Sequence, residues 1–209
     1  MKQHFPSSMK LAVRFALLLV LGGLAQAQEA IPLEEAQRAA RKLVSVSSSA
    51  SDLPFPVNAD AERPAGLKGG EAGVIVLPDK TLTAEVVAAA GKTFVPIGQL
   101  WSLKVTLASA GRSFSSDKLR LVSVGDGERT REVQFFLLGV VKNEQGALEL
   151  GVFGKGAEPL YRVALQKAGS GSQSLPIELS GTKTSEESAR LTLNVLGQYT
   201  ADLDVIKAD

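Results

Sequence analysis

The chain has 209 residues, with 23 Lys and Arg against 22 Asp and Glu, one His and no Cys. The lack of cysteine excludes disulfides, thiolate metal sites, cysteine nucleophiles and haem attachment through cysteine. With 44% hydrophobic and 5% aromatic residues, the composition is typical of a globular protein rather than of a disordered or collagenous chain.

The first 27 residues have the three parts of a secretory signal peptide. Three basic residues, the last of them Arg14, precede an apolar stretch from Phe15 to Leu24, and Ala25-Gln26-Ala27 places small residues at both cleavage-recognition positions. The apolar run is roughly half of the 20 or so residues that span a membrane. We therefore predict cleavage after Ala27, and a secreted or periplasmic protein without a transmembrane segment after cleavage.

Cleavage would change the charge of the chain and remove its only histidine. It takes away three basic residues and no acidic one, so that 20 basic and 22 acidic residues remain and the net charge is −2. The basic residues lie among acidic ones, which argues against nucleic acid as a partner because phosphate binding needs a concentrated basic surface. His4 leaves with the signal, and Met9 is an alternative start to Met1 because residues 9–27 still hold a complete signal.

Residues 28–51 are predicted to contain an amphipathic helix at 33–46. Apolar residues recur at helical spacing, acidic residues lie in the first turn and basic residues follow, as the helix dipole favours; the apolar positions are Leu33, Ala36, Ala40, Leu43 and Val44. This alanine-rich stripe predicts a helix that buries little, and it leaves open whether the helix docks on a sheet. Residues 52–70 contain three prolines and three glycines and are interpreted as an irregular linker.

Residues 71–209 are predicted to form a β domain, because hydrophobic residues alternate with polar ones. Alternation is clearest at 101–108, 190–195 and 199–205. Further strands are expected near 73–77, 93–97, 119–124, 132–142, 147–153, 160–167 and 175–180. Residues 83–90 should form a short internal helix capped by Thr83. This pattern indicates a β-sandwich-like fold or open barrel of about eight to ten mostly antiparallel strands.

Two hairpins allow predictions of register. A four-residue loop at 143–146 would place Lys142 opposite Ala147 and pair Val141 with Leu148. In the last hairpin, a two-residue loop would turn aspartates toward the core, and a three-residue connection instead pairs Val195 with Tyr199. The segment Phe135-Phe136-Leu137-Leu138 is apolar on both faces and predicts a central strand.

A transmembrane β-barrel is the other fold in which an exported protein has strands of alternating polarity. Its strands need about 9–11 residues and girdles of aromatic residues. Several predicted strands are shorter, and few aromatic residues remain after cleavage. We therefore favour the soluble sandwich.

Glycine-containing motifs do not match nucleotide-binding loops. Gly91-Lys92-Thr93 resembles the end of a phosphate-binding loop, but Val86 stands where the first glycine is needed and the predicted helix precedes the motif. Gly151-Val152-Phe153-Gly154-Lys155-Gly156 has the wrong glycine order and no βαβ context for a dinucleotide fingerprint. A helix end and a strand end explain these two segments.

Surface solubility explains the remaining polar groups better than catalysis or metal binding does. Ser115 and Lys118 have the Ser-x-x-Lys spacing of a nucleophile–base pair, but they fall in a polar loop. The oxygen-bearing cluster Asn58, Asp60 and Glu62 is the most plausible weak metal site, ahead of Asp202 with Asp204 and of Asp126 with Glu128. Carbohydrate stacking would need Trp101, Tyr161 or Tyr199, and core packing is the better account of Trp101 and Tyr199. Accordingly, we assign no catalytic residue, no cofactor-binding residue and no metal ligand.

The leading hypothesis is a non-catalytic envelope or secreted protein, a binding or structural module that presents a sheet edge or loops to another macromolecule. Its partner would lie in the cell envelope or outside the cell. A small-ligand carrier with a barrel cavity is the first alternative. A hydrolase that uses carboxylates or a Ser–Lys dyad is the second, although the residues favour a protein that is not an enzyme, and no cofactor is expected.

Overall fold

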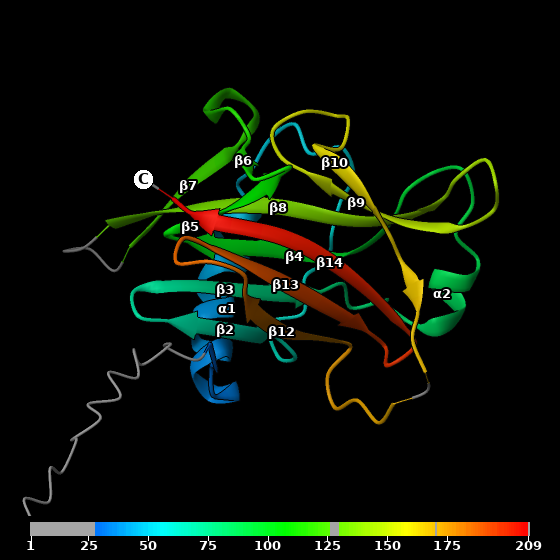
Figure 1. The fold of residues 1–209 in the computed structure, drawn as a ribbon, viewed down its shortest axis with the longest axis horizontal. Helices are drawn as coiled ribbons and strands as arrows, with labels where there is room; N and C mark the ends of the chain where they lie inside the picture. Colours follow the sequence, from blue (N-terminus) through cyan, green and yellow to red (C-terminus); the bar gives the residue numbers. More distant parts are fainter. Residues whose placement is uncertain (1–27, 126–129, 170, 209) are drawn as a thin grey trace, which may run out of the picture.

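The fold is a two-sheet β-sandwich with a helix on one outer face (Figure 1). The computed structural model describes residues 28–125, 130–169 and 171–208. The predicted signal peptide, residues 1–27, lies outside the described residues. Every strand pairing among the described residues is antiparallel, so the predicted all-β, sandwich-like fold is confirmed.

The larger sheet, called the first sheet below, has eight strands. In order they are β1 (Glu29–Ala30), β2 (Ala65–Gly69), β3 (Ala72–Pro78), β4 (Val95–Leu103), β8 (Thr130–Lys142), β9 (Leu148–Phe153) and β10 (Tyr161–Ala164), with β7 (Arg120–Gly125) also paired to β8. The segment that is apolar on both faces lies in β8, which has neighbours on both sides. The predicted central strand is therefore confirmed.

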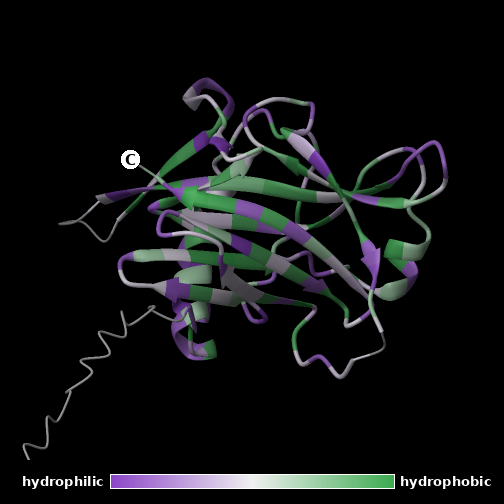
Figure 2. Cartoon of the chain, viewed as in Figure 1, coloured by the Kyte–Doolittle hydropathy of each residue, from purple (hydrophilic) through white to green (hydrophobic). Residues whose placement is uncertain are grey.

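The second sheet has six strands and packs on the first. In order they are β12 (Ile177–Lys183), β13 (Ser188–Val195), β14 (Tyr199–Lys207), β5 (Val105–Ser109) and β6 (Arg112–Ser113), with β11 (Gln166–Lys167) also paired to β14. Hydrophobic and hydrophilic residues alternate along β13 and β14 (Figure 2), as expected of strands with one buried face.

Among the described residues the chain passes between the sheets three times without closing a barrel, and one of these connections leads from β6 to β7 through residues 114–119. β4 runs into β5 through Lys104, whose φ is +56°, and β10 runs into β11 through Leu165. The space between the sheets is filled by apolar side chains that are 0–1% exposed, among them Leu100, Phe136 and Leu193. The closed sheet around a dry cavity that the barrel-carrier hypothesis requires is not formed by the described residues.

The helix α1 (Leu33–Ser47) docks on the outer face of the first sheet, which settles the question that its alanine-rich pattern left open. It buries Ala36, Ala40 and Leu43. Small alanine side chains let the helix approach the sheet closely, above Trp101 and Phe135, whose rings stack with centroids 4.3 Å apart. No helix among the described residues is both long and apolar enough to cross a membrane.

The linker prediction for 52–70 is wrong at its end, because residues 65–69 form β2 and the first sheet thus starts before residue 71. Two glycines in this strand weaken the strand pattern of its sequence, and hydrogen bonds to β3 hold these residues in the extended conformation instead. The short helix α2 (Ala84–Ala88) is capped by Thr83 as predicted, since the Thr83 hydroxyl accepts a hydrogen bond from the Val86 N–H.

The last hairpin has the predicted three-residue connection, and its register pairs Val195 with Tyr199. The other register prediction is wrong by one residue, because Lys142 pairs with Leu148 rather than with Ala147. The Asn143 side chain explains the longer loop. Its Oδ1 accepts hydrogen bonds from the backbone N–H groups of Gln145 and Ala147, at 3.1 and 2.9 Å.

The prediction of one continuous strand at 101–108 is also wrong. Positive φ at Lys104 divides it into β4 and β5 and reverses the alternation of faces. As a result Trp101 packs under α1, whereas Leu107 packs between the sheets. Nothing in the alternating pattern itself marks a lysine that adopts this backbone conformation.

Candidate functional site

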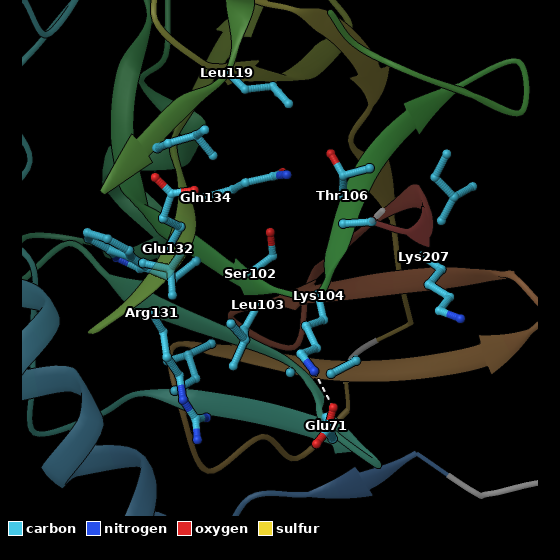
Figure 3. A pocket seen from close by; sticks show the side chains of 18 of the residues that line it. Glu71, Ser102, Leu103, Lys104, Thr106, Leu119, Arg131, Glu132, Gln134 and Lys207 are labelled. Carbon is cyan, nitrogen blue, oxygen red and sulfur yellow. Dashed lines mark hydrogen bonds and ion pairs between the residues drawn. The ribbon is translucent and has the colours of Figure 1, made fainter. Parts of the chain in front are cut away.

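A groove of about 1800 Å³ opens at the end of the sandwich where β4 leaves the first sheet (Figure 3). Its lining comes from α1, the β2–β3 hairpin, β4, β5, the segment between β6 and β7, β7, β8, the turn between β12 and β13 and the end of β14. These segments meet because Lys104 turns the chain from one sheet to the other, so that β5 diverges from β8 beyond this point. The groove is therefore a direct product of the sheet crossing.

Three polar side chains form the floor of this groove. Ser102 and Gln134 are cross-strand neighbours on β4 and β8, and Thr106 follows on β5. They are only 5%, 9% and 4% exposed, respectively. Figure 3 shows all three side chains pointing toward the same space.

The floor side chains carry buried oxygens that have no hydrogen-bond partner in the part of the chain that the structure describes: Ser102 Oγ, Thr106 Oγ1 and Gln134 Oε1. Buried polar groups are nearly always paired, and an unpaired one costs about 1–3 kcal/mol of stability. Three such oxygens in one place are therefore expensive for the fold. A ligand that supplied donors to them would recover that free energy, once the side chains turn outward as side chains commonly do on binding.

The walls of the groove are largely apolar. Leu119 is buried, whereas Leu121 on β7 is 49% exposed. Phe114 on the wall stacks on Tyr161, with ring centroids 5.4 Å apart. Burial raises the pKa of the Tyr161 phenol, and the charge of Asp204 adds to this, so Tyr161 stays protonated.

Charged residues of both signs surround the groove. Lys104 pairs with Glu71 on the β2–β3 hairpin (Figure 3), and this hydrogen bond, together with the lysine charge, lowers the pKa of Glu71. The full charged lining comprises Lys42, Lys68, Lys104, Arg131 and Lys207 with Glu35, Glu71, Glu132 and Glu187. Five basic and four acidic groups nearly cancel, so the groove carries little net charge.

The Ser115–Lys118 spacing does not produce a nucleophile–base pair. The Ser115 hydroxyl donates a hydrogen bond to Asp117 instead, which lowers the pKa of that carboxyl. Both Ser115 and Lys118 are exposed, at the 3₁₀ helix Ser116–Lys118.

The oxygen cluster at 58–62 is occupied by structural contacts. Asp60 is 7% exposed and accepts hydrogen bonds from the Glu62 N–H at 2.9 Å and from Arg63 Nε at 2.7 Å. Burial alone would raise the pKa of Asp60, but these hydrogen bonds and the charge of Arg63 outweigh it and lower the pKa. Glu62 also pairs with Arg41 of α1 at 2.8 Å. The cluster thus fixes the chain to the sheet and the helix.

The other carboxylate pairs lie on the surface or outside the described residues. Asp202 and Asp204 sit on the exposed face of β14, where Asp202 accepts a hydrogen bond from Thr192 at 2.6 Å and Asp204 contacts Arg190 at 3.4 Å. Asp126 and Glu128 lie outside the described residues. In the described part of the chain, no three Asp, Glu or His side chains are grouped to hold a metal ion.

The glycine motifs have structural roles. Gly91 follows α2, and its carbonyl accepts a hydrogen bond from the Lys142 N–H at 2.8 Å. Gly151 lies within β9 opposite Gly139 of β8, and a Cβ at either position would meet an aromatic ring, Phe94 above Gly151 and Phe55 above Gly139. The two glycines provide the space in which these rings pack on the first sheet.

Sequence reasoning missed the floor of the groove. Trp101 was expected to be core and is 2% exposed, but its neighbour Ser102 and the distant Thr106 and Gln134 gave no motif. The available signal was two polar residues with an apolar residue beside each of them on the same strand face, Leu100 before Ser102 and Phe136 after Gln134. Ser102, Thr106 and Gln134 come together because the chain crosses between the sheets at Lys104, and no sequence pattern predicts that crossing.

Fold and groove together define an all-β sandwich with a groove at one end, and the floor of this groove carries neutral polar side chains. Comparisons of the chain with protein-family models, with curated proteins and with solved structures found no match.

Proposed function

We propose that this protein is an exported, non-catalytic binding module that takes part of another macromolecule into the groove at the end of the sandwich. The observation that carries the proposal is the set of three buried oxygens, on Ser102, Thr106 and Gln134, whose side chains line one groove and which have no hydrogen-bond partner among the described residues. Side chains that cost the fold stability are retained when binding needs them.

The chemistry of the floor favours binding over catalysis. Serine, threonine and glutamine side chains donate and accept hydrogen bonds without ionising near neutral pH. Such groups recognise neutral polar ligands, and the aliphatic walls add apolar contact, which is the usual composition of a ligand site. The volume of about 1800 Å³ exceeds the roughly 300–1000 Å³ of small-molecule pockets, which favours a segment of a larger molecule.

The groove is tested by thermal unfolding of the full chain and of the Thr106→Val/Gln134→Met double variant. Both proteins are scanned against a random peptide library, cell-wall glycan fragments, lipids and Ca²⁺. A ligand at 100 times its dissociation constant raises the wild-type midpoint by roughly 5–11 °C. We expect the variant to lose that shift, and equal shifts in both proteins would place the binding site elsewhere.

Export is tested separately by mass spectrometry of the protein recovered from outside the cytoplasm. The signal pattern predicts a mature chain that begins at Gln28, after Ala27. An intact Met1 or Met9 terminus on the recovered protein would contradict cleavage.

A further inference from the structure

The first sheet has an unfilled strand position beside the beginning of β8. β4 pairs with β8 only as far as Ser102 and Gln134, and the chain then leaves the sheet at Lys104. Residues 130–133 of β8 continue beyond that point and pair with β7 on their other side. In the described part of the chain no strand pairs with these four residues on the side of β4.

The groove occupies this strand position, because its lining comes from both faces of the first sheet. Trp101 and Val133 belong to the face that α1 covers, whereas Ser102 and Gln134 belong to the face toward the second sheet. A pocket that lay on one face alone would be lined from that face only. A strand placed here would have neighbours above and below it, as a strand inside a sandwich does.

We propose that an extended segment of a partner polypeptide adds to the first sheet as a strand beside residues 130–133, in line with β4 and antiparallel to β8. This inference rests on the proposed function and names the molecule that occupies the groove. Neighbouring residues of a strand direct their N–H and C=O groups to opposite sides, so two of the four residues offer theirs to the open edge. A polypeptide main chain in the extended conformation matches those groups, as in other cases of strand addition.

The lining also indicates the side chains that such a segment would carry. Residues that face Ser102 and Gln134 should bear a hydroxyl or an amide, and alternate residues that face Trp101 and Val133 should be aliphatic. The near balance of basic and acidic groups around the groove favours an uncharged segment over a polyanion. A glycan is less favoured because the aromatic residues of the lining are already stacked within the protein, Trp101 (2% exposed) on Phe135 and Phe114 on Tyr161.

Amide hydrogen exchange followed by NMR tests the proposal on the full chain. The probe is a peptide selected for binding from a display library of random dodecapeptides, and the selected sequences should alternate aliphatic with hydroxyl or amide residues. In the free protein, two alternate amides among residues 130–133 should exchange rapidly. Bound peptide should slow them by at least about tenfold, while the two amides that pair with β7 are already protected.

Matched variants connect that protection to the groove. Gln134→Met and Thr106→Val should each raise the peptide dissociation constant by roughly 5- to 30-fold, the effect of one or two lost hydrogen bonds. Thr192→Val is the control, because the Thr192 hydroxyl bonds Asp202 on the exposed face of the second sheet. Its affinity should equal that of the wild type.

Three outcomes would overturn strand addition by a partner polypeptide. Peptide or glycan binding that depends on Gln134 but leaves amides 130–133 unprotected would keep the proposed function and remove the added strand. Protection that appears on concentrating the protein alone would identify a second copy of the chain as the occupant. Failure of every peptide and glycan to bind in a Gln134-dependent way would overturn both the strand and the proposed function.

Discussion

Two buried glutamines of the first sheet differ in their hydrogen bonding, and this difference leads to a sharp prediction. Gln99 is 2% exposed, its Oε1 accepts a hydrogen bond from Trp101 Nε1 at 3.2 Å, and its Nε2 donates to Ser47 Oγ at 3.4 Å. Gln134 is 9% exposed, and its Oε1 accepts no hydrogen bond from any described residue. Replacing each with methionine keeps a side chain of similar length and removes the amide.

The two substitutions should have opposite effects on the free energy of unfolding. Gln99→Met leaves the Trp101 N–H buried without an acceptor, which costs about 1–3 kcal/mol. Gln134→Met removes a buried oxygen that no described residue satisfies, so the free energy of unfolding should stay constant or rise by up to about 1–3 kcal/mol.

Urea unfolding followed by circular dichroism gives both free energies, and calorimetry gives the midpoints. Each kcal/mol corresponds to roughly 2–4 °C in a domain of this size. The Gln134→Met midpoint should therefore lie above that of Gln99→Met by at least about 2–4 °C. If Gln134→Met lost as much stability as Gln99→Met, Gln134 would serve the fold, and the argument that the groove is retained for binding would fail.

Three further predictions concern the scaffold. Gly151→Ala should lower the free energy of unfolding by about 1–3 kcal/mol in denaturant titrations, because the new methyl meets the Phe94 ring, whereas Gly91→Ala, with open space around it, should change it little. Lys104→Val should cost about 1 kcal/mol in the same assay, because a β-branched residue fits poorly at a φ of +56°, and a neutral result would contradict the account of the sheet crossing. The pKa of Asp60 is lowered by folding, so its contribution to stability is present above pH 3.8 and is lost as the pH falls below that value; Asp60→Asn should flatten the acid limb of stability measured against pH.

The sequence predicted the elements better than their connections. Alternation placed most strands, and the aspartates of β14 determined the register of the last hairpin, because a slip of one residue would have buried them. No such penalty constrains the loop after Lys142. Either register there places apolar residues on both faces, and the outcome depends on hydrogen bonds from the Asn143 side chain.

The groove depends on long-range geometry that local patterns do not contain. The crossing at Lys104 requires a backbone conformation that lysine rarely adopts, and it brings residues of β4, β5 and β8 to one place. Polar residues within apolar strands, such as Gln134, were the only local sequence pattern that pointed to the site. Gln99 is also a polar residue within an apolar strand, but its side chain accepts a hydrogen bond from Trp101 and stabilises the fold. The pattern alone therefore does not identify a site.

Trp101 is the single tryptophan of the chain, and its position determines what fluorescence reports. It lies between α1 and the first sheet, stacked on Phe135, rather than between the two sheets. Tryptophan emission is therefore an optical signal of the helix layer, whereas far-ultraviolet dichroism is dominated by the strands. Unfolding curves recorded by the two methods would coincide if the layers open together, and an earlier fluorescence transition would show that the helix separates from an intact sandwich.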